Sequence, residues 1–146
     1  MRGPFWLLAR LCRPRAWRDD MTPPQAGRWG EDWAAWHYFH HRGAAILARN
    51  WTNGQNEIDL ILREGDVLVF CEVKVRRAAD QEPLASVRDP RRIRHLRSAA
   101  ISYYQMLPAP RPRVRFDALL VTPDPERPRD PQINVLEEIY STEGVV

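Results

Sequence analysis

The stretch EIDLILREGDVLVFCEVKV, residues 57–75, decides the fold of this 146-residue chain. Aliphatic residues are concentrated in two runs, 57–63 and 67–75. Glu64-Gly65 between them is a tight-turn signal, so the stretch predicts a β-hairpin. Both runs are almost continuously apolar, which is typical of strands that are covered on both faces. The hairpin is therefore expected near the centre of a sheet.

The elements on either side of the hairpin predict an α/β fold. Before the hairpin we expect a helix over 27–42, which ends at Gly43, and a strand over 44–51. After the hairpin we expect a helix that begins after the N-cap Asp89 and stops before Pro108. Two further strands are expected over 114–121 and 133–140. A hairpin followed by a helical crossover favours a mixed central sheet flanked by helices. Residues 1–24 are basic and contain four prolines. We expect them to form a poorly ordered extension of a single domain over 25–142.

Composition excludes several classes of protein. Hydrophobic residues make up 44% of the chain, too many for a disordered protein. No apolar run reaches the length of about 18 residues that a membrane-spanning helix needs. The two cysteines cannot build a disulfide framework or a four-thiolate zinc site. We expect a cytoplasmic protein without a membrane partner. The sequence leaves open whether translation starts at Met1 or at Met21.

Charge is distributed unevenly along the chain. Residues 88–115 carry eight arginines and one acid, whereas residues 116–146 carry two arginines and seven acids. A basic block indicates an anionic partner, with nucleic acid as the first candidate, and a solvated helix face is the alternative. The candidate contacts to phosphates are Arg76, Arg91, Arg92 and Arg94.

Alternation of side chains brings polar residues of the hairpin together. With a two-residue turn at Glu64-Gly65, Asp59 pairs with Phe70 and lies diagonal to Glu72. Lys74 then lies on the same face as both carboxylates. Charged side chains are costly in a buried sheet unless they are paired or bind an ion. A three-residue turn would break this arrangement, and a ladder of salt bridges on an exposed sheet face is the alternative interpretation.

Two carboxylates close together offer the oxygen ligands that Mg²⁺ or Mn²⁺ prefers. Such an ion activates water and stabilises charge on a phosphate oxygen. Lys74 is the single lysine among 22 basic residues, and its compact charge suits a role in orienting that water or neutralising the phosphate. Glu57, at the start of its strand, is expected to pair with an arginine rather than to act as a third carboxylate.

Asp59, followed thirteen residues later by Glu72-Val73-Lys74, resembles the signature of the PD-(D/E)XK nucleases. Further residues extend this to a resemblance to the YraN family, whose members are uncharacterised and predicted to be endonuclease-like. The residues that carry it are Gly30-Glu31, Asn50, 57–61, 70–76 and Arg115-Phe116-Asp117. The resemblance covers residues 27–140. Two positions depart from the family pattern, with Asn56 in place of the usual glycine and Arg92 in place of the usual lysine.

The resemblance implies a restriction-endonuclease-like αβββαβ core, akin to that of archaeal Holliday-junction resolvases, with a mixed central sheet flanked by helices and one extra C-terminal strand. It also implies a metal-dependent endonuclease that hydrolyses phosphodiester bonds of DNA, structured or branched DNA included. Asp59 and Glu72 would hold Mg²⁺ or Mn²⁺, and Lys74 would assist the attacking water. Glu31 would reach the site from the first helix. DNA is expected rather than RNA, and a homodimer is expected by analogy.

Two other functions stay open, because a fold does not determine an activity. One is a non-catalytic nucleic-acid-binding module on the nuclease fold. The other is a protein-assembly factor that docks a partner through the acidic residues 116–146.

Overall fold

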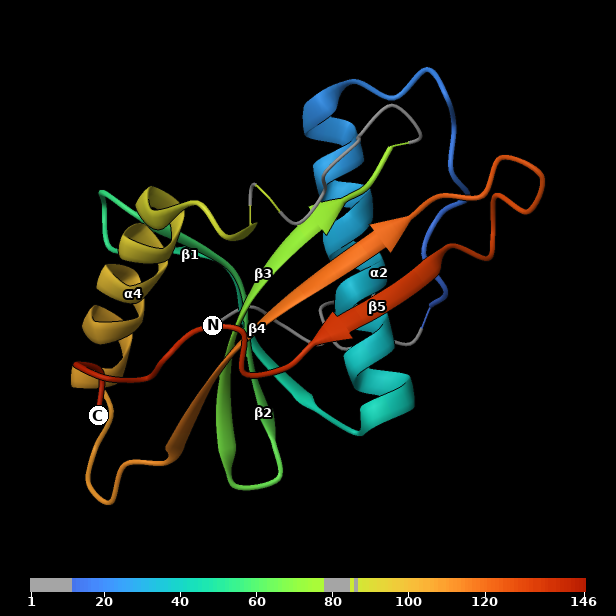
Figure 1. The fold of residues 1–146 in the computed structure, drawn as a ribbon. Coiled ribbons are helices and arrows are strands. Elements are labelled where there is room, and N and C mark those ends of the chain that lie inside the picture. The colour runs from blue at the N-terminus through green and yellow to red at the C-terminus, as the bar shows by residue number, and fades with distance from the viewer. Residues whose placement is uncertain (1–11, 78–84, 86) are drawn as a thin grey trace.

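A computed structural model describes residues 12–77, 85 and 87–146 (Figure 1). Its elements are α2 (Pro23–Arg42), β1 (Ala45–Thr52), β2 (Glu57–Glu64), β3 (Val67–Val75), α4 (Pro90–Gln105), β4 (Arg113–Thr122) and β5 (Gln132–Leu136). The five strands form one sheet in the order β1-β2-β3-β4-β5. All neighbouring strands are antiparallel except β3 and β4, which are parallel. The predicted α/β fold with a mixed sheet is confirmed.

The helices pack on opposite faces of this sheet (Figure 1). Alternate residues of β3 divide between them: Val69 and Cys71 belong to the core under α2, whereas Leu68 and Phe70 belong to the core under α4. All four side chains are buried, so β3 is covered on both sides, as its continuous hydrophobicity indicated. Within the described residues, neither helix is apolar enough over a sufficient length to cross a bilayer.

Helix α2 begins four residues earlier than predicted, at Pro23 instead of residue 27. Thr22 is its N-cap and forms a capping box, in which the side chains of Thr22 and Gln25 accept hydrogen bonds from each other's backbone N–H groups. Proline is favourable in the first turn of a helix, where its missing N–H would have no partner. The two prolines that suggested an irregular extension therefore start the helix.

The N-terminal segment, defined as residues 12–22, packs against α2 (Figure 1). Trp17 anchors it: its ring is buried in the α2 core and meets the ring of Trp29 edge-on at 4.9 Å. The backbone N–H of Trp17 donates to the carbonyl of Pro128 at 2.7 Å. The remainder of the predicted extension, residues 1–11, lies outside the described residues.

The hairpin turn is formed by Gly65-Asp66, one residue later than predicted. The strand register therefore shifts by two residues, and the last pair of the β2–β3 ladder is Leu60 with Cys71. One step beyond this pair, Asp59 comes opposite Glu72 instead of lying diagonal to it. A shift of two residues preserves the alternation of faces, so the correction brings the two acidic positions closer together.

Strand β5 is shorter than predicted and ends at Leu136 instead of residue 140. The reason lies at Glu138, whose φ of 51° leaves the extended conformation. The backbone N–H of Glu138 donates to the carboxylate of Asp117 at 3.2 Å instead of to a neighbouring strand. The other strand boundaries agree with the prediction to within one residue.

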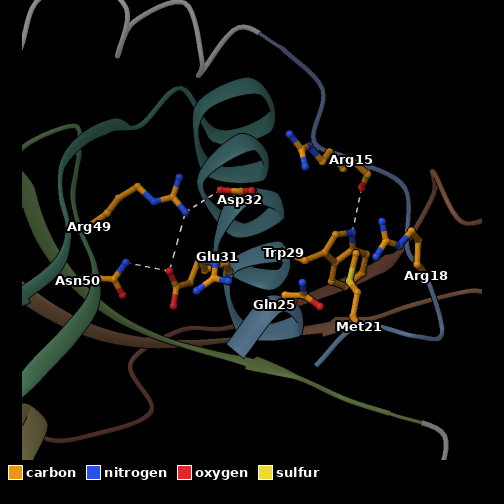
Figure 2. A pocket seen from close by; sticks show the side chains of 10 residues that line it. Arg15, Arg18, Met21, Gln25, Trp29, Glu31, Asp32, Arg49 and Asn50 are labelled. Carbon is orange, nitrogen blue, oxygen red and sulfur yellow. Dashed lines mark hydrogen bonds and ion pairs between the residues drawn. The ribbon is translucent and has the colours of Figure 1, made fainter. Parts of the chain in front are cut away.

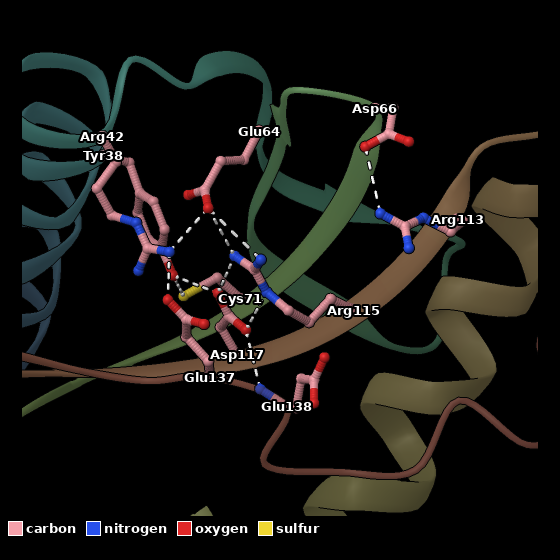
Figure 3. Close-up of polar contacts among 10 residues, drawn as sticks. All are labelled: Tyr38, Arg42, Glu64, Asp66, Cys71, Arg113, Arg115, Asp117, Glu137 and Glu138. Carbon is pink, nitrogen blue, oxygen red and sulfur yellow. Dashed lines mark hydrogen bonds and ion pairs between the residues drawn. The ribbon is translucent and has the colours of Figure 1, made fainter.

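A buried polar network joins α2 to the sheet (Figure 3). Asp117 is fully buried and accepts two hydrogen bonds from the guanidinium of Arg115, at 2.8 and 2.9 Å, and one from the hydroxyl of Tyr38, at 2.9 Å. Burial and the neighbouring Cys71 and Asp117 raise the pKa of Tyr38, so its hydroxyl remains a donor. The outer members of the network are Arg42, Glu64 and Glu137.

Helix α2 packs closely against the sheet at Gly30. A methyl group at this position would overlap Cγ2 of Val75 and lie 3.7 Å from Cγ1 of Val73. Glycine therefore allows the helix to pack directly on the end of β3, and it fixes the position of the residue that follows it, Glu31.

We predict that Gly30→Ala lowers the free energy of unfolding by about 1–3 kcal/mol, because the packed side chain of Val75 must shift to admit the methyl group. Gly27→Ala, in the same helix but with no atom within 4 Å of the added methyl, should instead raise it by about 0.5–1 kcal/mol. Urea denaturation of both variants measures the difference. Equal stability of the two variants would contradict the close packing of α2 on β3.

Candidate active site

Asp59 lies where the β2–β3 ladder stops. Beyond Leu60 and Cys71 the strands no longer pair, and the Asp59 carboxylate accepts a hydrogen bond from the backbone N–H of Val73 at 2.8 Å. Burial raises the pKa of Asp59, and the nearby carboxylate of Glu72 contributes to a value of about 8, against the smaller opposing effect of the Val73 hydrogen bond. Among the residues that the structure describes, none forms an ion pair with Asp59.

Glu72 is the second acid of this site and is only 8% exposed. Burial raises its pKa, whereas the guanidinium of Arg92 and the ammonium of Lys74 lower it. Arg92 reaches Glu72 from α4 and forms an ion pair with it. On the other side, the β3–β4 register sets Glu72 beside Ala118, whose small side chain leaves room for the carboxylate.

Two further carboxylates influence this pair. Glu31, on α2, and Glu57, at the start of β2, both raise the pKa of Asp59, which shows that all of these acids share one neighbourhood. Glu31 is held by a hydrogen bond from the Asn50 amide at 2.9 Å and by Arg49 at 3.8 Å. We call Glu31, Glu57, Asp59 and Glu72 the acid cluster.

The prediction that Glu57 pairs with an arginine is wrong. Glu57 makes no ion pair with any residue that the structure describes. It lines a cavity of about 180 Å³ together with Glu72, Arg92 and His95. The sequence analysis did not single out His95, although it follows Arg92 by three residues on α4, a spacing that puts both on one face of the helix.

Lys74 is half-buried on β3 and close enough to Glu72 to lower its pKa. It forms no ion pair within the described part of the chain. Its ammonium is therefore available to a ligand. Of the four residues singled out as catalytic from the sequence, Glu31 and Glu72 are near enough to Asp59 to raise its pKa, and Lys74 lies near Glu72.

The four arginines predicted to contact phosphates fall into two groups, three that are exposed and unpaired among the described residues and one that contacts Glu72. Arg76, Arg91 and Arg94 are exposed and form no ion pair among the described residues. Arg92 instead contacts Glu72 and so belongs to the site itself. The basic surface that remains on α4 is therefore next to the acid cluster rather than part of it.

The acids fit a magnesium-like ion bound through few protein ligands. Among the described residues, no group of three or more His, Cys, Asp or Glu side chains is arranged so that it could hold a metal ion. Mg²⁺ does not require one, since it commonly binds through one or two carboxylates and completes its shell with water and substrate phosphate. Asp59 and Glu72, whose mutual repulsion a divalent cation would relieve, match that mode. Arg92 would have to leave Glu72 to admit the ion.

We predict that the stability of the metal-free protein falls as the pH rises from about 4 to about 8. Because the folded state raises the pKa of Asp59 to about 8, it binds a proton more tightly than the unfolded chain, and that stabilisation is lost on deprotonation. One such proton gives a slope of at most about 1.4 kcal/mol per pH unit. Asp59→Asn should flatten the profile measured by urea denaturation.

Mg²⁺ added at pH 8 should stabilise the wild type more than at pH 6, because the ion binds the deprotonated acids. Asp59→Asn should abolish this effect, whereas Asp66→Asn, at an exposed carboxylate of the hairpin turn, should keep it. A metal-induced rise in Tm that is equal in Asp59→Asn and wild type would contradict the assignment of Asp59 as a ligand.

Comparison with known proteins places the chain in a family. The profile of the uncharacterised protein family UPF0102 matches residues 30–121. A UPF0102 protein of Parafrankia sp. (strain EAN1pec) is 44% identical over 95 residues, which are 65% of this chain and 80% of that protein. One of Syntrophomonas wolfei is 36% identical over 97 residues, 66% of this chain and 84% of that protein. The match includes every member of the acid cluster, and the chain belongs to UPF0102, the YraN family that its motifs resemble.

Proposed function

We propose that this chain is a divalent-metal-dependent nuclease that hydrolyses phosphodiester bonds of DNA. The observation that carries the proposal is the pair of buried acids, Asp59 and Glu72, whose pKa values burial raises. A site that holds two such carboxylates beside an unpaired lysine has the charge pattern that phosphoryl chemistry requires: ligands for a cation, and a cation for a phosphate.

Each residue would have a defined part in the reaction. Asp59 and Glu72 would hold Mg²⁺ or Mn²⁺, which when bound lowers the pKa of water and offsets the charge that develops on the phosphate. Lys74 would donate a hydrogen bond to the attacking water or to a phosphate oxygen. The water oxygen would form the new bond to phosphorus and lose a proton, and the bond from phosphorus to the leaving sugar oxygen would break as that oxygen takes up a proton from solvent. Glu31, fixed by Asn50, would accept a proton or orient a water from the α2 side.

The exposed arginines next to the site support a nucleic-acid substrate. Arg91 and Arg94 on α4 and Arg76 at the end of β3 carry charge that no described residue neutralises. Contacts of this kind bind the phosphate backbone without regard to base sequence. The family resemblance favours DNA over RNA and brings branched DNA among the candidate substrates.

One observation favours a second candidate, a binding module without turnover. Arg92 already neutralises Glu72 by an ion pair, and the YraN pattern usually has lysine at this position. If the pair persists when nucleic acid binds, Glu72 cannot serve as a metal ligand. Such a module would bind nucleic acid equally well with Mg²⁺ and with EDTA.

We predict that the protein cuts labelled DNA in Mg²⁺ or Mn²⁺ and not in EDTA. Single-stranded, duplex and four-way-junction DNA and a matched RNA should be compared by gel electrophoresis. Asp59→Asn and Glu72→Gln should abolish cutting, and Lys74→Ala should slow it by about 10²-fold or more. Asp66→Asn serves as the matched control and should cut like the wild type.

Cutting that survives in Asp59→Asn would show that the acid cluster is not the active site. Binding without cutting in every metal, unchanged by EDTA, would favour the non-catalytic module. Each variant should first be shown to fold by its circular dichroism and urea-unfolding profile.

A further inference from the structure

A second cavity, of about 450 Å³, lies between the N-terminal segment, α2 and β1 (Figure 2). Its lining contains four arginines and two acids, an excess of two positive charges. The charged residues around it are Arg15, Arg18, Arg28, Arg49, Glu31 and Asp32. We call this cavity the basic groove.

The groove is held in shape by hydrogen bonds from buried side chains. The indole N–H groups of Trp29 and Trp33 both donate to the carbonyl of Arg15, at 2.9 and 3.2 Å (Figure 2 shows the first). At the other end of the segment, the guanidinium of Arg77, just beyond β3, donates to the carbonyl of Met21 at 3.2 Å. These contacts use the backbone of the segment, so the side chain of Arg15 is left free for another role.

The charges in the groove do not cancel. Arg49 forms ion pairs with Asp32 at 2.7 Å and with Glu31 at 3.8 Å (Figure 2). Arg15 and Arg28 are exposed and form no ion pair with any residue that the structure describes. The groove therefore presents two uncompensated guanidinium groups, which are suited to contact phosphate oxygens.

The groove adjoins the acid cluster at Glu31, which lines the groove. Glu31 follows Gly30, which packs against Val73 and Val75 of β3, and the backbone N–H of Val73 donates to the Asp59 carboxylate at 2.8 Å. A chain of phosphates that contacts Arg15 and Arg28 would thus run toward the proposed metal ligands. The cavity volume is of the scale of small-molecule pockets, so a single strand can enter it, whereas a duplex would only lie across its mouth.

We infer that the basic groove binds the phosphate backbone of a single-stranded segment of nucleic acid and directs it to the acid cluster. This inference rests on the proposed function and deepens it, because it makes a single-stranded region a feature of the substrate. One wall of the groove, Arg15 to Trp29, precedes the UPF0102 match, which begins at residue 30. Arg15 and Arg28, which carry its uncompensated charge, therefore lie outside the residues that the family profile matches.

The test compares Arg15→Gln/Arg28→Gln with a charge-matched control, Arg63→Gln/Arg113→Gln. The control arginines line a different cavity, at the hairpin-turn end of the sheet. Binding of a fluorescent single-stranded DNA and of the corresponding duplex should be measured by anisotropy in EDTA over a range of salt concentrations, and cleavage should be measured in Mg²⁺. Unfolding in urea confirms that both double variants are folded.

We expect the groove variant to bind single-stranded DNA at least about tenfold more weakly at low salt. The slope of the logarithm of the binding constant against the logarithm of the salt concentration should fall in magnitude by about 1.4. Each phosphate contact to a single strand contributes about 0.7 to this slope, and the variant loses two. Duplex binding should change less, and the control variant should match the wild type. If the wild type binds and cuts DNA while both double variants bind single strands equally, the groove inference fails and the proposed nuclease stands. If the wild type neither binds nor cuts any nucleic acid, the proposed function fails and the inference falls with it.

Discussion

A carboxylate that is fully removed from water must be neutralised by its surroundings, and Asp117 meets this requirement inside the fold. The guanidinium of Arg115 donates two hydrogen bonds to it, and the hydroxyl of Tyr38 donates a third. Because Tyr38 belongs to α2 and the other two residues to β4, the interaction fixes the helix against the strand (Figure 3). The backbone N–H of Glu138 completes the set and ends β5.

This network also sets the geometry of the candidate site on the neighbouring strand. Asp117 is the register partner of Cys71, and so the next residue, Glu72, pairs with Ala118. Consecutive residues of a strand point to opposite faces. The same register that buries Cys71 beside Tyr38 under α2 therefore turns Glu72 toward Arg92 on α4.

The contrast between Asp117 and Asp59 explains why the second is assigned a function. Asp117 has a cation and a hydroxyl as partners, whereas the described contacts of Asp59 are a single backbone N–H and the nearby carboxylates that raise its pKa. A buried acid with this environment destabilises the fold at neutral pH unless something outside the protein compensates its charge. The proposed divalent cation at Asp59 and Glu72 would supply Asp59 with the positive charge that its described neighbours lack.

The sequence was informative where local chemistry decides the structure. The bounds of β3 and the cap at Asp89 were predicted correctly, because hydrophobic runs and capping residues act over a few positions. The turn was predicted one residue early, since Glu64-Gly65 and Gly65-Asp66 are both acceptable two-residue turns. The role of Trp17 could not be predicted, because its partners, Trp29 and Pro128, are distant in the chain and leave no periodic pattern.

Of the candidate site, the acids on β2 and β3 could be predicted because strand alternation relates them directly. The pairing of Arg92 with Glu72 could not, since it depends on how α4 lies across the sheet. The basic groove was missed for a similar reason: its arginines come from the N-terminal segment, α2 and β1, and only the tertiary packing brings them together.

The claim that the paired acids form a metal site is tested most directly by a crystal structure at pH 8 with Mn²⁺, using its anomalous scattering. The account predicts one strong peak within about 2.0–2.5 Å of carboxylate oxygens of both Asp59 and Glu72, with the Arg92 guanidinium moved away from Glu72. An anomalous map without a peak at these residues, in which Arg92 still contacts Glu72 at saturating Mn²⁺, would contradict it.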